Sequence, residues 1–155
     1  MDSPTLAPTE KDLFDLATVM AQDEVQFYVT HPKTKKPTTW CWTFYGPGHP
    51  NTVAVANRVI REALETQAAK EQARVNGRKW KEEAEEIETL RQRNIASIVA
   101  RTKEFSPVKI GPETITFSPE TASKLLLDRN MGWLLDQVTE WLASIENFIQ
   151  PSPKS

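Results

Sequence analysis

Few residues in this sequence are of the types that catalyse reactions or bind metal ions. The two histidines, His31 and His49, each stand next to a proline, and neither has a carboxylate at a recognisable metal-ligand spacing. The single cysteine, Cys41, has no nearby base or helix N-terminus in the sequence that would activate its thiol. Nucleophile motifs and glycine-rich phosphate loops are missing from the sequence. We therefore expect a protein that is not an enzyme and that uses no metal or cofactor.

The balance of charges gives no general attraction to nucleic acids or anionic lipids. The chain has 19 Lys and Arg residues against 21 Asp and Glu residues, a net charge of -2. Lys33, Lys35 and Lys36 stand shortly before a tryptophan-rich run and could belong to a nucleic-acid site. The preferred interpretation is a turn that its lysines keep soluble, because the rest of the chain adds no basic face.

The sequence carries no signal for export or membrane insertion. No apolar run approaches the roughly 18 residues that span a bilayer, and the first residues are acidic and proline-rich, unlike a signal peptide. A lone cysteine excludes an intramolecular disulfide, which agrees with a reducing compartment. We expect a cytoplasmic protein.

The order of the predicted elements indicates a single α+β domain over residues 23–149. Residues 1–22 are expected to form a flexible or weakly helical leader, and residues 150–155 a disordered tail. Within the domain we predict an N-terminal β-hairpin, two central helices in an arm over residues 52–104, and a module over residues 105–149. That module consists of a small β-hairpin and C-terminal amphipathic helices.

The N-terminal hairpin is predicted from two runs. Apolar residues alternate with polar ones over residues 25–29, and β-branched and aromatic residues fill residues 39–45. In the second run Trp40, Trp42 and Phe44 share one face. We prefer to assign that face to the core, and an exposed aromatic platform for a partner is the alternative.

The arm begins with a long predicted helix, from Thr52 to Asn76, which contains no proline or glycine and has Asn51 or Thr52 as its N-cap. Its apolar residues are concentrated before Leu64, so the second half is expected to project into solvent or to wait for another chain. After the helix stop at Gly77, a second helix is predicted to continue to about residue 104. The two helices either fold back on each other, with Trp80 as an anchor, or extend as a free arm.

The C-terminal module has the clearest local signals. The strands Val108–Ile110 and Thr114–Phe117 flank a Gly-Pro-Glu turn, and Ser118 followed by Pro119 marks the start of a helix. The last predicted helix carries an apolar stripe at spacings of four and three residues. Its members are Leu134, Val138, Trp141, Ile145 and Phe148.

Partner contact is predicted for arm residues that gain little by packing within their own domain. In the alternative interpretation of the aromatic face, in which it is an exposed platform, contact is predicted for that face too. These residues are Glu65, Ala69, Gln72, Trp80, Trp40 and Trp42.

Several segments together resemble the small tail assembly chaperones of siphophage-type bacteriophages and prophages. They are HPKTKKPTTWCWTFYGPGHPNT, VANRVIRE, EQARVNGRKWK, PVKIGPETITFSPETASKLLLD, GWLLDQVTEWL and ENFI, and they cover most of residues 25–149. The resemblance implies a non-enzymatic helper in the cytoplasm of the infected or lysogenic host. Such a helper binds the helical tape measure protein, keeps it soluble and recruits major tail protein subunits. A homo-oligomer is also compatible with it.

Two other functions stay open. The chain could be a structural part of the virion, such as a minor tail or head-tail connection protein, whose N-terminal hairpin adds to a neighbour's sheet. A small nucleic-acid-binding or regulatory protein is the less favoured alternative, and it predicts an affinity that falls steeply with salt.

Overall fold

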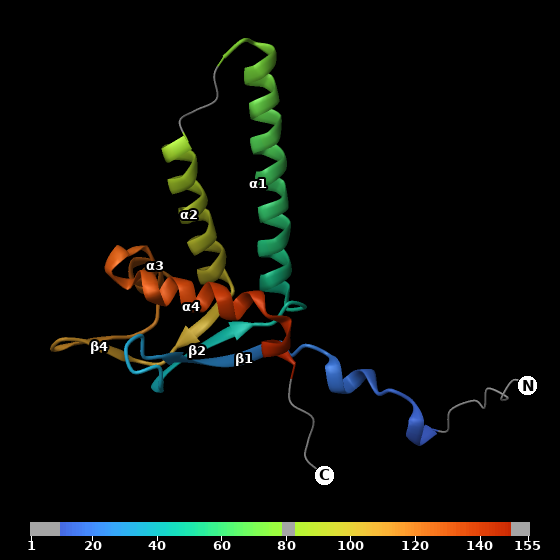
Figure 1. Ribbon diagram of the computed structural model, residues 1–155, viewed down its shortest axis with the longest axis vertical. Helices are drawn as coiled ribbons and strands as arrows, with labels where there is room; N and C mark the ends of the chain where they lie inside the picture. Colours follow the sequence, from blue (N-terminus) through green and yellow to red (C-terminus); the bar gives the residue numbers. More distant parts are fainter. Residues whose placement is uncertain (1–9, 79–82, 150–155) are drawn as a thin grey trace, which may run out of the picture.

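The computed structural model describes residues 10–78 and 83–149 of the chain. It is an α+β protein, as the sequence predicts, in which a sheet is covered on one face by helices and two further helices stand away from it (Figure 1). We call the sheet, its covering helices and the small C-terminal hairpin the body. The two standing helices are the arm.

The main sheet has three antiparallel strands in the order β1-β2-β3. Strand β1 (Glu24–Thr30) pairs with β2 (Pro37–Tyr45), which confirms the predicted N-terminal hairpin. Strand β3 (Thr102–Phe105) pairs with the other side of β2, opposite Trp42 to Phe44. The connection between β1 and β2 is stabilised by His31, whose Nδ1 accepts hydrogen bonds from the backbone of the two residues after the proline.

The third strand was missed by the sequence prediction, which extended the second arm helix to residue 104. In the structure the helix α2 (Glu83–Ala100) ends earlier, and the Thr102 hydroxyl donates to the Ile98 carbonyl at 2.7 Å. The strand then places Phe105 against Trp40 and Trp42, with ring centroids 5.5 and 5.0 Å away. Burial of this aromatic side chain against the sheet outweighs the local helical preference, which is a weak determinant.

The helix α1 (Pro50–Val75) begins two residues before its predicted start. Its N-cap is His49, not Asn51 or Thr52, because His49 Nδ1 accepts from the Asn51 backbone N–H at 3.1 Å. The His49 ring also stacks on Tyr45 with centroids 4.0 Å apart. Thr52 is instead buried, and its hydroxyl donates to the Tyr45 carbonyl.

The C-terminal module follows its local signals. Strands β4 (Val108–Ile110) and β5 (Glu113–Ile115) form the small hairpin, with Gly111 at a positive φ in the turn. Helix α3 (Pro119–Leu127) starts with a capping box between Ser118 and Thr121. This confirms the predicted helix start, and the second strand ends two residues earlier than predicted.

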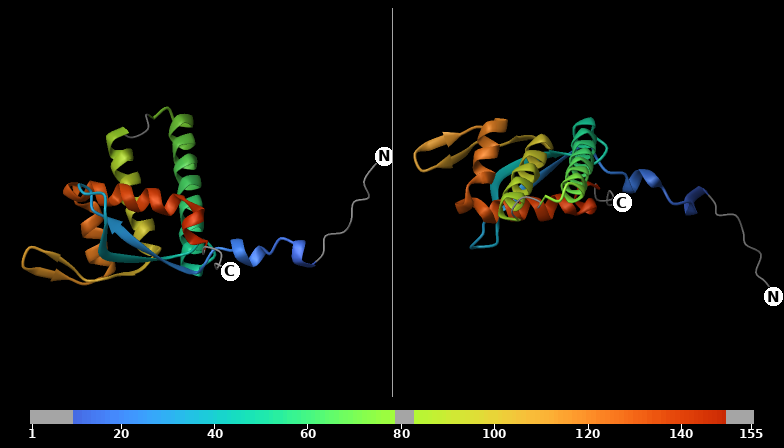
Figure 2. Two further views of the ribbon diagram at one scale, coloured as in Figure 1. Left: turned by 60° about the horizontal axis from the view of Figure 1, so that its bottom comes forward. Right: turned by 90° about the horizontal axis from the view of Figure 1, so that it is seen from above.

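Helix α4 (Gly132–Ala143) lies across the sheet, and a short 3-10 turn, η3 (Arg129–Met131), connects it to α3 (Figure 2). The helix ends before Ser144, and a second 3-10 turn, η4 (Ile145–Phe148), follows. Phe148 is buried, but Ile145 is exposed, so the predicted stripe is wrong at that position because the chain leaves the helix before it.

The core of the body lies between the sheet and the helices α2, α3 and α4. The largest fully buried side chains come from these elements and from η4. They are Val29, Trp42, Phe44, Ile95, Leu126, Leu134, Val138 and Phe148. The aromatic face of β2 is thus part of the core, which confirms the preferred interpretation of that face.

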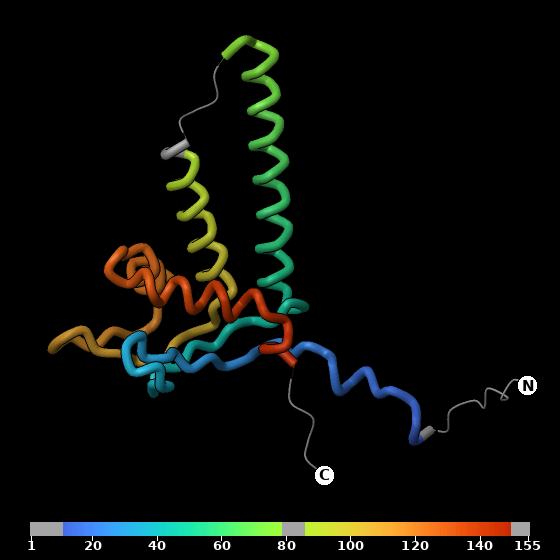
Figure 3. The backbone as a smooth tube through the Cα atoms, in the orientation of Figure 1, coloured from blue at the N-terminus to red at the C-terminus, as the bar shows by residue number. Residues whose placement is uncertain are grey.

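The described part of the leader lies along an extended path away from the body (Figure 3). It contains two 3-10 turns, η1 (Glu10–Asp12) and η2 (Leu16–Val19), where a short α-helix was only weakly indicated. It joins the body where Ala21 forms a β-bridge with Ile149. No helix among the described residues is both long and apolar enough to cross a bilayer.

Candidate functional site

The arm is attached to the body through short stretches at its base. In α1 only Thr52 and Val55 are buried, and among the described side chains of α2 only Ile95 and Ile98. The two helices run side by side away from the sheet in all views of the molecule. The arm therefore folds back as a helical hairpin, which is the first of the two arrangements that the sequence left open.

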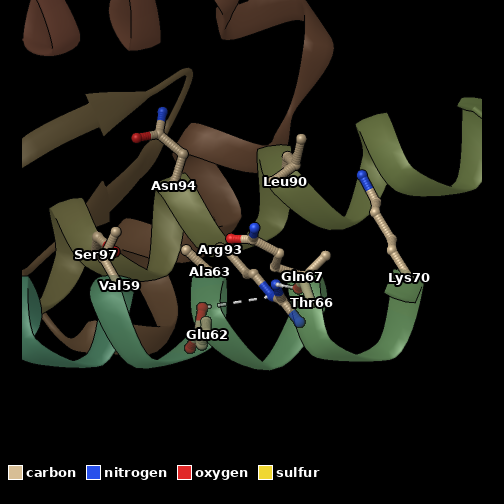
Figure 4. A pocket seen from close by; sticks show the side chains of 10 residues that line it. All are labelled: Val59, Glu62, Ala63, Thr66, Gln67, Lys70, Leu90, Arg93, Asn94 and Ser97. Carbon is tan, nitrogen blue, oxygen red and sulfur yellow. Dashed lines mark hydrogen bonds and ion pairs between the residues drawn. The ribbon is translucent and has the colours of Figure 1, made fainter. Parts of the chain in front are cut away.

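A groove of about 590 Å³ lies between the two arm helices (Figure 4). Its walls are one face of each helix, because the lining positions recur at spacings of three and four residues. The lining residues are Val59, Glu62, Ala63, Thr66, Gln67 and Lys70 of α1, and Leu90, Arg93, Asn94 and Ser97 of α2. We call this feature the arm groove.

The two arm helices meet mainly through polar contacts, and we call this line of contact the seam. Lys70 Nζ lies 2.7 Å from Glu86 Oε1, and Arg93 Nε lies 3.4 Å from Glu62 Oε2. Arg93 also donates to the Thr66 hydroxyl, at 3.4 Å. Ion pairs this exposed contribute about 0–1 kcal/mol each, so they orient the helices without holding them together strongly.

Apolar side chains of the arm are left largely in solvent. Leu90 in the groove is 55% exposed, and Leu64 of α1 is 63% exposed. Val59 and Ile60 of α1 and Ile87 of α2 are exposed as well. On α1, the exposed Val53, Ile60 and Leu64 follow a spacing of seven and four residues, which places them along one side of the helix. The arm thus presents an apolar strip bordered by charges.

The predicted partner residues fall into three groups. Glu65, Ala69 and Gln72 are exposed on α1, but none of them lines the arm groove. Trp80 lies outside the described residues. Trp40 and Trp42 are buried in the core and do not form an exposed platform. Partner contact through Glu65, Ala69 and Gln72 stays a prediction.

Sequence reasoning missed Val59, Leu64 and Leu90 as candidates for partner contact. They look like ordinary core positions in an amphipathic helix, so the pattern favoured burial. The signal that could have found them is the scarcity of apolar partners elsewhere in the arm, which leaves these side chains nothing to pack against.

The histidines, Cys41 and Arg101 make the following contacts. His31 and His49 accept backbone hydrogen bonds, as described above. Burial is the main cause that raises the pKa of the Cys41 thiol, which disfavours the reactive thiolate. Burial also lowers the pKa of Arg101, which lies 5.3 Å over the Phe148 ring and donates to the Tyr45 carbonyl. Within the described residues, no three His, Cys, Asp or Glu side chains are grouped so that they could hold a metal ion.

Comparison of the chain with protein-family models, with curated proteins and with solved structures gives no match.

Proposed function

We propose that this protein is a phage tail assembly chaperone whose arm binds a helical segment of the tape measure protein. The observation that carries the proposal is the arm groove, where Leu90 and Val59 stay exposed between two helices joined mainly by polar contacts. The sequence resemblance names the partner, and the groove suggests how it is bound.

An amphipathic helix is the kind of partner that fits this surface. Helix-in-groove recognition uses anchors at spacings of three, four and seven residues, and the groove walls repeat at the same spacings. A third helix in the groove would cover the exposed side chains of Val59 and Leu90, and the charged groups of the lining would stay at the edge of the contact. The apolar face of a tape measure helix would be shielded from aggregation in the same way.

Recruitment of the major tail protein and action in the cytoplasm of a bacterial host belong to the same proposal. A chaperone of this kind leaves before the tail is complete. Purified virions that contain the protein in stoichiometric amounts would instead identify it as a structural component.

Co-expression of the full chain with the tape measure protein of the same phage or prophage tests the proposal. The wild-type chain is expected to co-purify with that protein and to raise its soluble yield. Leu90→Asp places a charge in the arm groove and should reduce both readouts. Ile110→Asp is the matched control, because Ile110 is 52% exposed on the β4–β5 hairpin, close to the 55% of Leu90. A wild-type chain that neither co-purifies nor raises the yield refutes the proposal.

A further inference from the structure

The outer edge of β1 carries a row of backbone groups that point away from the sheet. The Tyr45 N–H, opposite Glu24, donates to the Arg101 carbonyl on the far side of β2. Cys41, opposite Tyr28, exchanges its backbone hydrogen bonds with Ser106 on that same side. Bonded and non-bonded pairs alternate in antiparallel strands. The N–H and C=O groups of Glu24, Gln26 and Tyr28 therefore face outward from β1.

These outward groups are available to a ligand. The backbone groups of Glu24, Gln26 and Tyr28 have no hydrogen-bond partner in the part of the chain that the structure describes, and all three residues are exposed. An edge of this kind is a template for strand addition, and proteins usually protect it.

At both ends of the β1 edge, other parts of the chain already form hydrogen bonds with the outward backbone groups. At one end the Gln22 N–H donates to the Phe148 carbonyl at 2.7 Å. At the other end the Thr30 N–H donates to Gln137 Oε1 at 3.0 Å, and Gln137 Nε2 donates to the Thr30 carbonyl at 2.6 Å. The Gln137 amide thus occupies the place of one residue of a neighbouring strand. Among the described residues, none closes the stretch opposite residues 24–28.

A groove adjoins this open stretch at Phe27, on the face of the sheet that α4 covers. It has a volume of about 430 Å³, and Phe27 and Trp141 are among its lining residues, with ring centroids 5.2 Å apart. Thr30 and Gln137 line it too, so it adjoins the closed end of the edge. Side chains alternate between the two faces of a strand. An added strand would therefore place every second side chain toward this groove.

The short length of the open stretch limits which polypeptide segment can pair with it. The β1 strand of a second copy is longer than the gap and would meet Phe148 and Gln137 at its ends. Residues 1–9 and 150–155 each contain two prolines and have no run of five residues without one, and proline cannot donate to a strand ladder. The ends of this chain are thus poor candidates.

We propose that the edge of β1 binds an extended segment of another protein by β-strand addition, with about five residues paired and an apolar side chain in the groove between β1 and α4. This inference rests on the edge geometry and is independent of the proposed chaperone function. It assigns a second binding surface, in the body and separate from the arm.

Hydrogen exchange of the full chain, followed residue by residue, tests the inference with a probe peptide. The probe is acetyl-Thr-Leu-Thr-Leu-Thr-Lys-Lys-amide, whose threonines would pair with the edge while its leucines face the groove. At about 1 mM peptide, the Glu24, Gln26 and Tyr28 amides are expected to exchange at least about tenfold more slowly. Methylation of the threonine nitrogens should abolish this effect, and methylation of the leucine nitrogens should preserve it.

A variant of the protein provides a second readout. Gln26→Pro removes one outward N–H without touching the β1–β2 ladder, and proline is tolerated at such edge positions. It should abolish binding of the peptide, whereas the control Gln26→Thr should retain it. If Gln26→Pro does not fold, the methylated peptides decide the question on the wild-type chain.

Three results would overturn the inference. The first is an absence of slowing at the three amides with the unmodified peptide. The second is slow exchange at these amides in the free chain, which would mean that the chain covers its own edge. The third is slowing that rises with protein concentration without peptide, which would assign the edge to a second copy.

Discussion

The body and the arm both contain amphipathic elements, yet they bury their apolar residues to very different extents. In the body, Trp42 is fully buried and its ring lies 5.0 Å from Phe105 and 5.8 Å from Phe44. In the arm, Leu64 and Leu90 remain more than half exposed. The difference follows from the number of neighbours. Elements from distant parts of the chain meet around Trp42, whereas among the described side chains of the arm only the base of α2, with Ile95 and Ile98, belongs to that core cluster.

Apolar side chains therefore contribute differently to stability in the body and in the arm. In the body they supply stability, because burial removes apolar surface from water at about 25 cal/mol per Å². In the arm much of the apolar surface stays in contact with water, so its removal should affect stability little. Variants in the two regions should therefore differ in their effect on folding.

The largest difference is expected for truncation of a core tryptophan. Trp42→Ala should lower the free energy of unfolding by about 3–5 kcal/mol, and Leu64→Ala in the arm by less than about 0.5 kcal/mol. Chemical denaturation of the full chain measures both. Trp42→Phe should cost less than Trp42→Ala, since the indole N–H of Trp42 has no hydrogen-bond partner among the described residues. Equal losses for Trp42→Ala and Leu64→Ala would contradict the division between body and arm.

A smaller effect is expected where the backbone of the body is tightly packed. A Cβ atom at Gly46 would meet the Gln22 carbonyl oxygen, whereas one at Gly48 would meet nothing within 4 Å. Gly46→Ala should therefore cost about 1–3 kcal/mol, and Gly48→Ala should be close to neutral. Thermal unfolding of the two variants provides the comparison, and similar melting temperatures would argue against close packing at Gly46.

The reactivity of a cysteine thiol should differ between the body and the arm. Burial raises the pKa of the Cys41 thiol, so a smaller fraction is thiolate at a given pH. Cys41 should thus react with a disulfide reagent several-fold more slowly than a cysteine placed on the exposed arm by Ala69→Cys in a Cys41→Ser background. The rate for Cys41 should keep rising at higher pH, where the arm cysteine has already reached its maximum. Identical pH profiles would count against the burial of Cys41.

The smallest effect is expected from the ion pairs of the arm. Glu62→Gln weakens the pairs with Arg93 and Arg58, which are 3.4 and 3.7 Å long. Because these side chains are partly exposed, the free energy of unfolding should fall by about 0.2–1 kcal/mol at low salt and by less at high salt. Chemical denaturation at two ionic strengths measures the loss. A loss well above 1 kcal/mol would show that the seam is a major source of stability.

Much of the fold could be predicted because its signals are local. The alternation around Phe27 indicated β1, and Ser118 with Pro119 marked the start of α3. Caps, turns and periodic patterns act over a few residues, so they can be read from a short stretch of sequence. The same reasoning failed for β3, where pairing with β2 replaced the predicted helical end.

The candidate surfaces were harder to predict, because exposure depends on what lies nearby in space. Leu90 has the pattern of a buried residue, but its side chain is 55% exposed. The open edge of β1 is defined by Gln137, which is 107 residues away from Thr30 in the chain. No local pattern reveals such a contact.

The sequence by itself determined most of the elements, their order apart from β3, and the scarcity of residue types suited to catalysis. Only the tertiary structure decided which apolar side chains are buried and which part of the β1 edge stays open. The physical reason is that helix and strand preferences arise within a few residues, whereas burial and edge protection arise from contacts between segments far apart in the chain.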